Sequence, residues 1–87
     1  MATNATIFGC RTRVIEQLDG HAGRHGIVNA HTPLSAKLGN LGIGTQECAI
    51  LEDYVNRERA ARGLGPVAAG SIKVGTTIGE VMTSACG

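Results

Sequence analysis

The chain has 87 residues, a formal net charge of +1 and 43% hydrophobic residues, which is enough apolar surface for one small folded domain. Phe8 and Tyr54 are its two aromatic residues, so a stacking platform for nucleic-acid bases is hard to build. The small net charge and the lack of a long apolar run argue against nucleic-acid and membrane binding. We expect one domain over residues 1–87, no signal peptide and a cytoplasmic location.

Apolar residues recur at three-, four- and seven-residue offsets from Thr6 to Leu18, a spacing that places them on one face of a helix. We predict a first helix over these residues, ending at Asp19 and Gly20. Its apolar face is formed by Ile7, Phe8, Val14, Ile15 and Leu18.

The segment from Gly20 to Leu41 is rich in glycine and predicts a long ordered loop, with a short helical turn at Leu34 to Leu38. Apolar residues along it are expected to pack it down: Ile27, Val28, Leu34, Leu38, Leu41 and Ile43. The loop also holds His21, His25 and His31. A four-residue histidine spacing converges on a metal only within a helix, and the glycines argue against one. We therefore expect solvated histidines and no metal site.

Thr45 to Arg62 is the clearest helical segment. Thr45 is an expected N-cap, Glu47 suits the positive end of the helix dipole, and Gly63 should stop the helix. The predicted buried stripe consists of Cys48, Leu51, Val55 and Tyr54. The predicted solvent face consists of Glu52, Asp53, Asn56 and Arg57.

Two shorter helices are predicted after this segment. Pro66 suits the first turn of a short third helix towards Ile72. Thr77 and Glu80 have the spacing of a capping box, which predicts a last helix containing Val81, Met82 and Ala85. The result is an all-α bundle of four helices.

Cys10, Cys48 and Cys86 are odd in number and lack the CxxC spacing, so we expect reduced thiols rather than a disulfide framework. Cys48, near a predicted helix N-terminus, is the one candidate for a low-pKa thiolate. Burial without a redox role is the expectation for all three.

The order of long helix, long loop, long helix, short helix and last helix resembles that of the acyl carrier protein family. The stretch from Leu38 to Glu47 resembles the family's leucine-glycine segment and the start of its second helix. The stretch from Thr76 to Val81 resembles the start of its last helix. The resemblance covers about residues 6–85 and implies a four-helix carrier bundle of lipid or polyketide biosynthesis. It also implies a serine bearing 4'-phosphopantetheine.

The sequence departs from the family at the attachment position. Thr45 stands where the family has the modified serine, Gly44 replaces an aspartate, and Gln46 replaces a leucine. The extra methyl of threonine crowds the reacting oxygen, which weighs against attachment of the group. Thr45 thus has two candidate roles, as a plain N-cap and as the attachment site.

We expect a monomeric protein that docks on a partner through the Thr45 end of the second helix, on Gly44, Gln46, Glu47 and Ile50. The resemblance implies a dedicated biosynthetic enzyme or a phosphopantetheinyl transferase as that partner. Charges of both signs on the second helix predict weak electrostatic steering. Because no serine has a neighbouring histidine and acid in the sequence, no catalytic residues are expected. The alternative function is a helical adaptor without a covalent cofactor.

Overall fold

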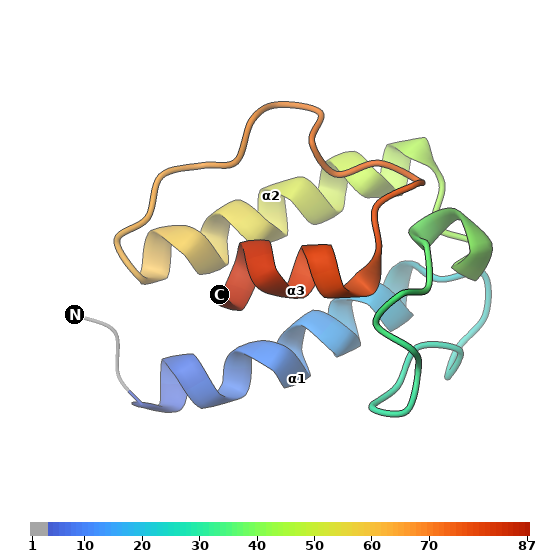
Figure 1. Ribbon diagram of the computed structural model, residues 1–87, viewed down its shortest axis with the longest axis horizontal. Helices are drawn as coiled ribbons and strands as arrows, with labels where there is room; N and C mark the ends of the chain where they lie inside the picture. The colour runs from blue at the N-terminus through green and yellow to red at the C-terminus, as the bar shows by residue number, and fades with distance from the viewer. Residues whose placement is uncertain (1–3) are drawn as a thin grey trace.

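Three α-helices and one 3-10 turn make up the regular structure of the computed structural model, which describes residues 4–87, with side chains from residue 9 onward. The helices are α1 (Asn4–His21), α2 (Thr45–Ala61) and α3 (Ile78–Cys86), and the turn is η1 (Leu38–Leu41). Figure 1 shows α3 beside both α1 and α2. The predicted all-α class is confirmed. None of the helices within residues 4–87 is long and apolar enough to cross a bilayer.

Helix α1 is longer than the predicted segment and extends to His21. Val14 and Leu18 are fully buried and Ile15 is partly buried, as the periodicity predicted. Ile7 and Phe8, also expected on this face, precede residue 9, from which side chains are described. Asp19 was expected to end the helix. Instead its carboxylate accepts hydrogen bonds from the backbone N–H groups of Gly26 and Val28, which folds the following loop back onto α1.

The long first loop is anchored by Val28, Leu38, Leu41 and Ile43, which are all buried, whereas Leu34 is 49% exposed. The helical turn lies at η1, a few residues later than predicted. Gly42 follows with φ of 82°, in the left-handed region, and a Cβ there would lie 2.6 Å from the backbone of Gly23. The loop therefore needs glycine at this crossing.

The first loop also holds the start of α3. The Leu38 and Gly39 N–H groups donate to Thr76 O and Val74 O, and the Ile78 and Gly79 N–H groups donate to Ala36 O and Leu34 O. The last two are donors in the first turn of a helix, which have no partner within the helix. The predicted capping box at Thr77 and Glu80 is confirmed and completes this end.

Helix α2 closely matches its predicted range. Cys48, Leu51, Tyr54 and Val55 are buried, as expected. At its end the chain turns at Gly63, which has φ of 76°, and the Leu64 N–H donates to Arg59 O. This is the glycine-terminated helix end that the sequence predicted.

The predicted short third helix from Pro66 to Ile72 was wrong. Residues 62–77 contain no helix, and Figure 1 shows this connection, in orange, running back beside α2 towards the start of α3. Polar side chains of α2 hold it in this irregular path, by hydrogen bonds to its backbone at Gly65, Val67 and Gly70. The bundle therefore has three α-helices within the described residues, not four.

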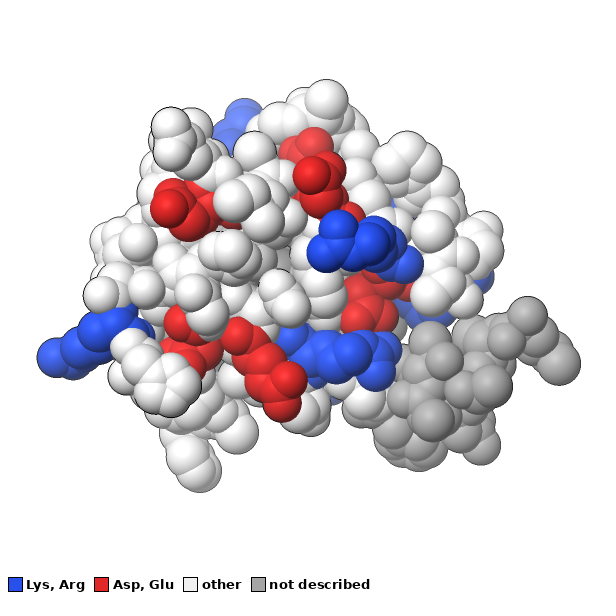
Figure 2. All heavy atoms as spheres, turned by 180° about the vertical axis from the view of Figure 1, so that it is seen from behind, with Lys and Arg blue, Asp and Glu red and all other residues white. Residues whose placement is uncertain are grey.

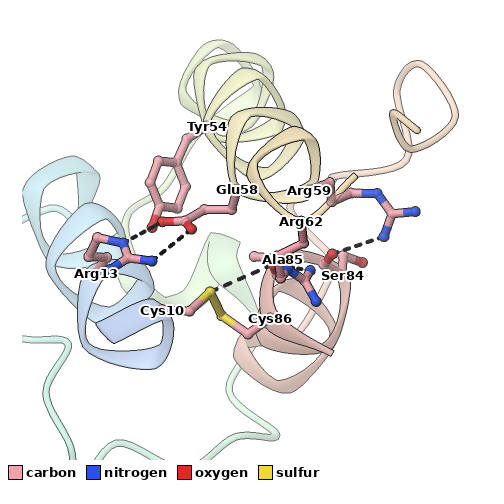
Figure 3. The surroundings of a disulfide bond; sticks show 9 residues. All are labelled: Cys10, Arg13, Tyr54, Glu58, Arg59, Arg62, Ser84, Ala85 and Cys86. Atoms are coloured by element: carbon pink, nitrogen blue, oxygen red, sulfur yellow. Dashed lines mark hydrogen bonds and ion pairs between the residues drawn. A yellow bond between two sulfur atoms is a disulfide. The ribbon is translucent and has the colours of Figure 1, made fainter. Parts of the chain in front are cut away.

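The expectation of three reduced thiols was also wrong, because the structure pairs Cys10 with Cys86 in a disulfide. The two residues are 76 apart in sequence, but the packing of α3 on α1 brings their Cα atoms to 5.8 Å (Figure 3). That distance is normal for a disulfide. Cys10 Sγ also lies 3.6 Å from Ala85 O, which is a contact only, since a disulfide sulfur carries no proton.

Arg59 near the end of α2 and Arg62, its C-cap residue, both contact the C-terminal end of α3. Arg59 donates from Nη1 to Ser84 O at 3.0 Å, and Arg62 donates to Ala85 O. These carbonyls lie in the last turn of α3, where cations are favourable because of the helix dipole (Figure 3). The C-terminal end of α3 is thus fixed covalently to α1 and by hydrogen bonds to α2.

Candidate functional site: the Thr45 end of helix α2

Gly44, not Thr45, is the N-cap of α2. Gly44 has the extended backbone of an N-cap (φ −85°, ψ −179°), and Thr45 is the first helical residue. The predicted capping role of Thr45 is therefore wrong by one position. The Thr45 side chain is exposed, and its hydroxyl makes no hydrogen bond to another described residue. The N–H groups of the first turn likewise receive no side-chain cap.

The other residues expected to dock a partner lie at the N-cap of α2 or within its first two turns. Gln46 is exposed, Gly44 and Glu47 are half-buried, and Ile50 is 51% exposed. A Cβ built on Gly44 would lie 3.1 Å from Glu47 Oε2. An aspartate at position 44 would thus need the Glu47 carboxylate to move. Whether a partner binds these residues stays a prediction.

A cavity of about 350 Å³ lies next to Thr45, between α2 and the segment that follows residue 69. Four of its lining residues come from α2 and four from the connection to α3: Thr45, Cys48, Ala49, Glu52, Gly70, Ile72, Lys73 and Val74. Most of these side chains are apolar or small. Such a lining suits an apolar group more than a charged one.

Cys48 was the candidate for a reactive thiolate, and its surroundings oppose that role. It is 2% exposed, and burial together with the nearby Glu47 carboxylate raises the pKa of its thiol. Both effects favour the neutral thiol. Cys10 and Cys86 are paired, so Cys48 is the free cysteine of the chain, and it forms part of the cavity wall.

The three histidines expected in the loop are divided between two elements: His21 ends α1, whereas His25 and His31 lie in the loop that follows. His25 Nδ1 lies 3.3 Å from Asp19 Oδ2, with its ring almost fully exposed, while His21 is half-buried and His31 is exposed. Among residues 4–87 no group of three metal-ligating side chains converges.

The residues at Thr45 fit a phosphodiester-linked group such as 4'-phosphopantetheine in two respects. The free hydroxyl stands at the positive end of a 17-residue helix whose first N–H groups lack a side-chain cap, which favours a phosphate there. The adjacent cavity is lined by one cation, Lys73, and one carboxylate, Glu52, so its charges oppose each other. Thr45 would carry the group, and the group when bound would supply a thiol for a thioester.

Sequence reasoning missed the wall of the cavity. Ile72, Lys73 and Val74 were assigned to the end of a helix or left without a role, yet they face Thr45 across the cavity. Their position follows from backbone pairing of residues 74 and 76 with the first loop. Sequence patterns do not report such long-range contacts.

Comparisons with protein-family models, curated proteins and solved structures gave no match for this chain.

Proposed function

We propose that this protein is a carrier-like helical domain of the acyl carrier type, which serves a dedicated biosynthetic partner and presents Thr45 to it. The observation that carries the proposal is the exposed Thr45 hydroxyl at the first position of α2, where it is not used as a helix cap. A hydroxyl that caps a helix accepts a hydrogen bond from a backbone N–H, which engages one of its lone pairs. This one is available to a modifying enzyme.

An exposed apolar side chain near the start of α2 and the mixed charges on one face of the protein support recognition by apolar contact rather than by long-range charge. Ile50, one and a half turns further along α2, is 51% exposed. On the face drawn in Figure 2, acidic and basic groups of the described residues are interspersed and form no large patch of one sign. Because long-range steering needs a field of one sign, a dedicated partner fits better than a general basic one.

The test is the intact mass of the protein after co-expression with a broad-specificity phosphopantetheinyl transferase. The expected result is a partial mass increase of one phosphopantetheine group, located on Thr45 by peptide mapping. Thr45→Ser should load more fully, because it removes the crowding methyl. Thr45→Val should not load, and Thr12→Val, which removes an exposed hydroxyl on α1, should load like the wild type.

A second set of variants distinguishes the carrier from the alternative, an adaptor without a covalent cofactor. Adding Gly44→Asp and Gln46→Leu to Thr45→Ser restores the family pattern, and loading should rise further. A folded triple variant that stays unloaded, beside a reference carrier that loads fully, would leave the adaptor function. In that case Ile50 and Gln46 remain the proposed contact surface.

We propose a cytoplasmic location, as expected from the sequence, although the disulfide removes the argument that three reduced cysteines gave for it. Disulfides persist mainly in oxidising compartments, and Cys10 and Cys86 are paired. Alkylation of the protein in freshly broken cells, followed by mass analysis, would show whether one cysteine or three are free there.

A further inference from the structure

Three polar side chains on one face of α2 hold the connection between α2 and α3. Arg59 Nε donates to Gly65 O at 2.6 Å, the Val67 N–H donates to Asn56 Oδ1 at 2.9 Å, and the Gly70 N–H donates to Glu52 Oε1 at 2.8 Å. Residues 52, 56 and 59 lie one above another on a helix. We call the segment they hold, residues 64–72, the strap.

Apolar burial contributes little to holding the strap. Ile72 is its one buried residue, Val67 is partly buried, and Leu64 is 42% exposed. The hydrogen bonds at Gly65 and Gly70 are themselves exposed to solvent. Segments with few buried apolar contacts and solvent-exposed hydrogen bonds open at low free energy, independently of the rest of the fold.

Both ends of the strap adjoin firmly fixed structure. Before it, Gly63 ends α2, with φ of 76°. After it, Val74 O and Thr76 O accept hydrogen bonds from the first loop, and α3 is held by its capping box and the disulfide. The strap is therefore a weakly held segment between two fixed points. It can move while all three helices stay packed.

The strap covers the cavity beside Thr45. Gly70 and Ile72 of the strap form part of the cavity wall, and Cys48 of α2, which is 2% exposed, lines the same cavity. Glu52 lines the same cavity and also accepts the Gly70 hydrogen bond. Loss of that bond would release the cavity wall directly.

We propose that the strap is a gate over this cavity, which opens as a local unit, and that the bond between Glu52 and the Gly70 N–H is one of the contacts that keep it closed. The gate is a property of the fold and does not depend on modification of Thr45. A failure of phosphopantetheine loading would leave it untouched, and a failure of the gate would leave the loading result untouched.

Cys48 provides the probe, because opening of the strap exposes the one thiol that is not in the disulfide. Iodoacetamide is added to the intact, non-reduced protein at fixed pH, and alkylation of Cys48 is followed by mass spectrometry at increasing urea. Global unfolding is measured in parallel by circular dichroism. At low urea, alkylation through a local opening should depend only weakly on urea, and should steepen where global unfolding takes over.

Single substitutions on α2 then test whether the hydrogen bond between Glu52 and the Gly70 N–H keeps the strap closed. Glu52→Ala should speed alkylation at low urea by about fivefold, the effect of one ordinary hydrogen bond, with little change in the global unfolding midpoint. Asn56→Ala should act in the same direction. Asp53→Ala is the matched control, because Asp53 is exposed on α2 and makes no hydrogen bond to the strap.

Three outcomes would overturn the proposal. Alkylation with the same urea dependence as global unfolding would mean that Cys48 is exposed only when the whole protein unfolds. Equal rates of Cys48 alkylation in Glu52→Ala and Asp53→Ala would show that the Glu52 hydrogen bond does not hold the strap closed. A faster rate in Glu52→Ala that is matched by an equal loss of global stability would assign the effect to the fold as a whole.

Discussion

Arg13 on α1 and Glu58 on α2 form a two-point ion pair, with Arg13 Nε 2.7 Å from Oε2 and Nη2 2.9 Å from Oε1 of the carboxylate. The Tyr54 hydroxyl donates to the same Oε2 at 2.7 Å. Glu58 is 7% exposed, whereas the Arg13 side chain is 40% exposed. A buried carboxylate is thus satisfied by partners from two helices, and it joins α1 to α2 beside the core (Figure 3).

Glu58→Ala should lower the free energy of unfolding by roughly 1 to 3 kcal/mol, because the buried Tyr54 hydroxyl loses its acceptor and α1 loses its polar link to α2. Urea unfolding followed by circular dichroism measures the change. Asp53→Ala, an exposed acidic residue on the same helix, is the control and should differ little from the wild type. Equal stability of the two variants would contradict the role assigned to Glu58.

Because of the Glu58 carboxylate, we expect the stability of the protein to depend on pH in the acid range. Hydrogen bonds from Arg13 and then from Tyr54 hold the pKa of Glu58 below its usual 4.5, against the opposing effect of burial. A group with a lowered folded pKa stabilises the protein fully above its unfolded pKa, and this contribution is lost as the pH falls through the folded value. Stability should therefore fall below about pH 4.5.

Glu58→Gln should flatten this loss, which thermal unfolding at a series of pH values between 7 and about 2 would measure. Asp19, whose pKa the Val28 and Gly26 N–H groups lower, will keep part of the acid dependence in that variant. An unchanged profile in Glu58→Gln would contradict the prediction.

The disulfide should contribute strongly to stability, because it closes a loop with a sequence separation of 76 residues. Loop-closure entropy of the unfolded chain gives roughly 4.5 kcal/mol for a loop of this size. Comparing urea midpoints with and without reductant measures it, and Cys10→Ser with Cys86→Ser should match the reduced wild type. A midpoint that is insensitive to reductant would show that the pair does not cross-link the chain.

Gly42→Ala should be one of the most damaging glycine substitutions. Its φ of 82° and the 2.6 Å approach of Gly23 both exclude a Cβ, and the expected loss of stability is about 1 to 3 kcal/mol. Gly65→Ala is the control, because no atom lies within 4 Å of its added Cβ and its φ is not positive. Equal midpoints would mean that the crossing of the two loop segments is not tight.

Substitutions in the capping box of α3 should lower stability by a smaller amount. Thr77→Ala should cost about 1 kcal/mol, because the Glu80 N–H loses its acceptor. Thr77→Ser keeps the hydroxyl and should recover most of the loss, as measured by the thermal midpoint. If the serine variant has a thermal midpoint as low as that of the alanine variant, the loss of stability comes from the missing methyl instead.

Local patterns predicted the parts of the fold that are stabilised locally. The range of α2 and the Thr77 capping box follow from residues within one or two turns of each other, and both are confirmed. The cap of α2 was placed one residue late, because a glycine N-cap carries no side-chain signal. Its detection required the backbone geometry.

Long-range contacts decided the features that the sequence did not predict. Pro66 indicates a helix start, but α2 residues 52, 56 and 59 hold the segment in another conformation. Cys10 and Cys86 meet only because α3 packs against α1. The candidate site has the same limit, since Thr45 was identified from the sequence and its facing cavity wall was not.

The disulfide has a practical consequence for handling the protein. Cys86 lies at the end of α3 that is joined to the first half of α1, so the start of α1 and the C-terminus leave the bundle at one end (Figure 1). Thr45 begins α2 at the opposite end. A tag, a fused domain or a sensor surface attached at either terminus would therefore leave the Thr45 end facing outward for a partner in solution.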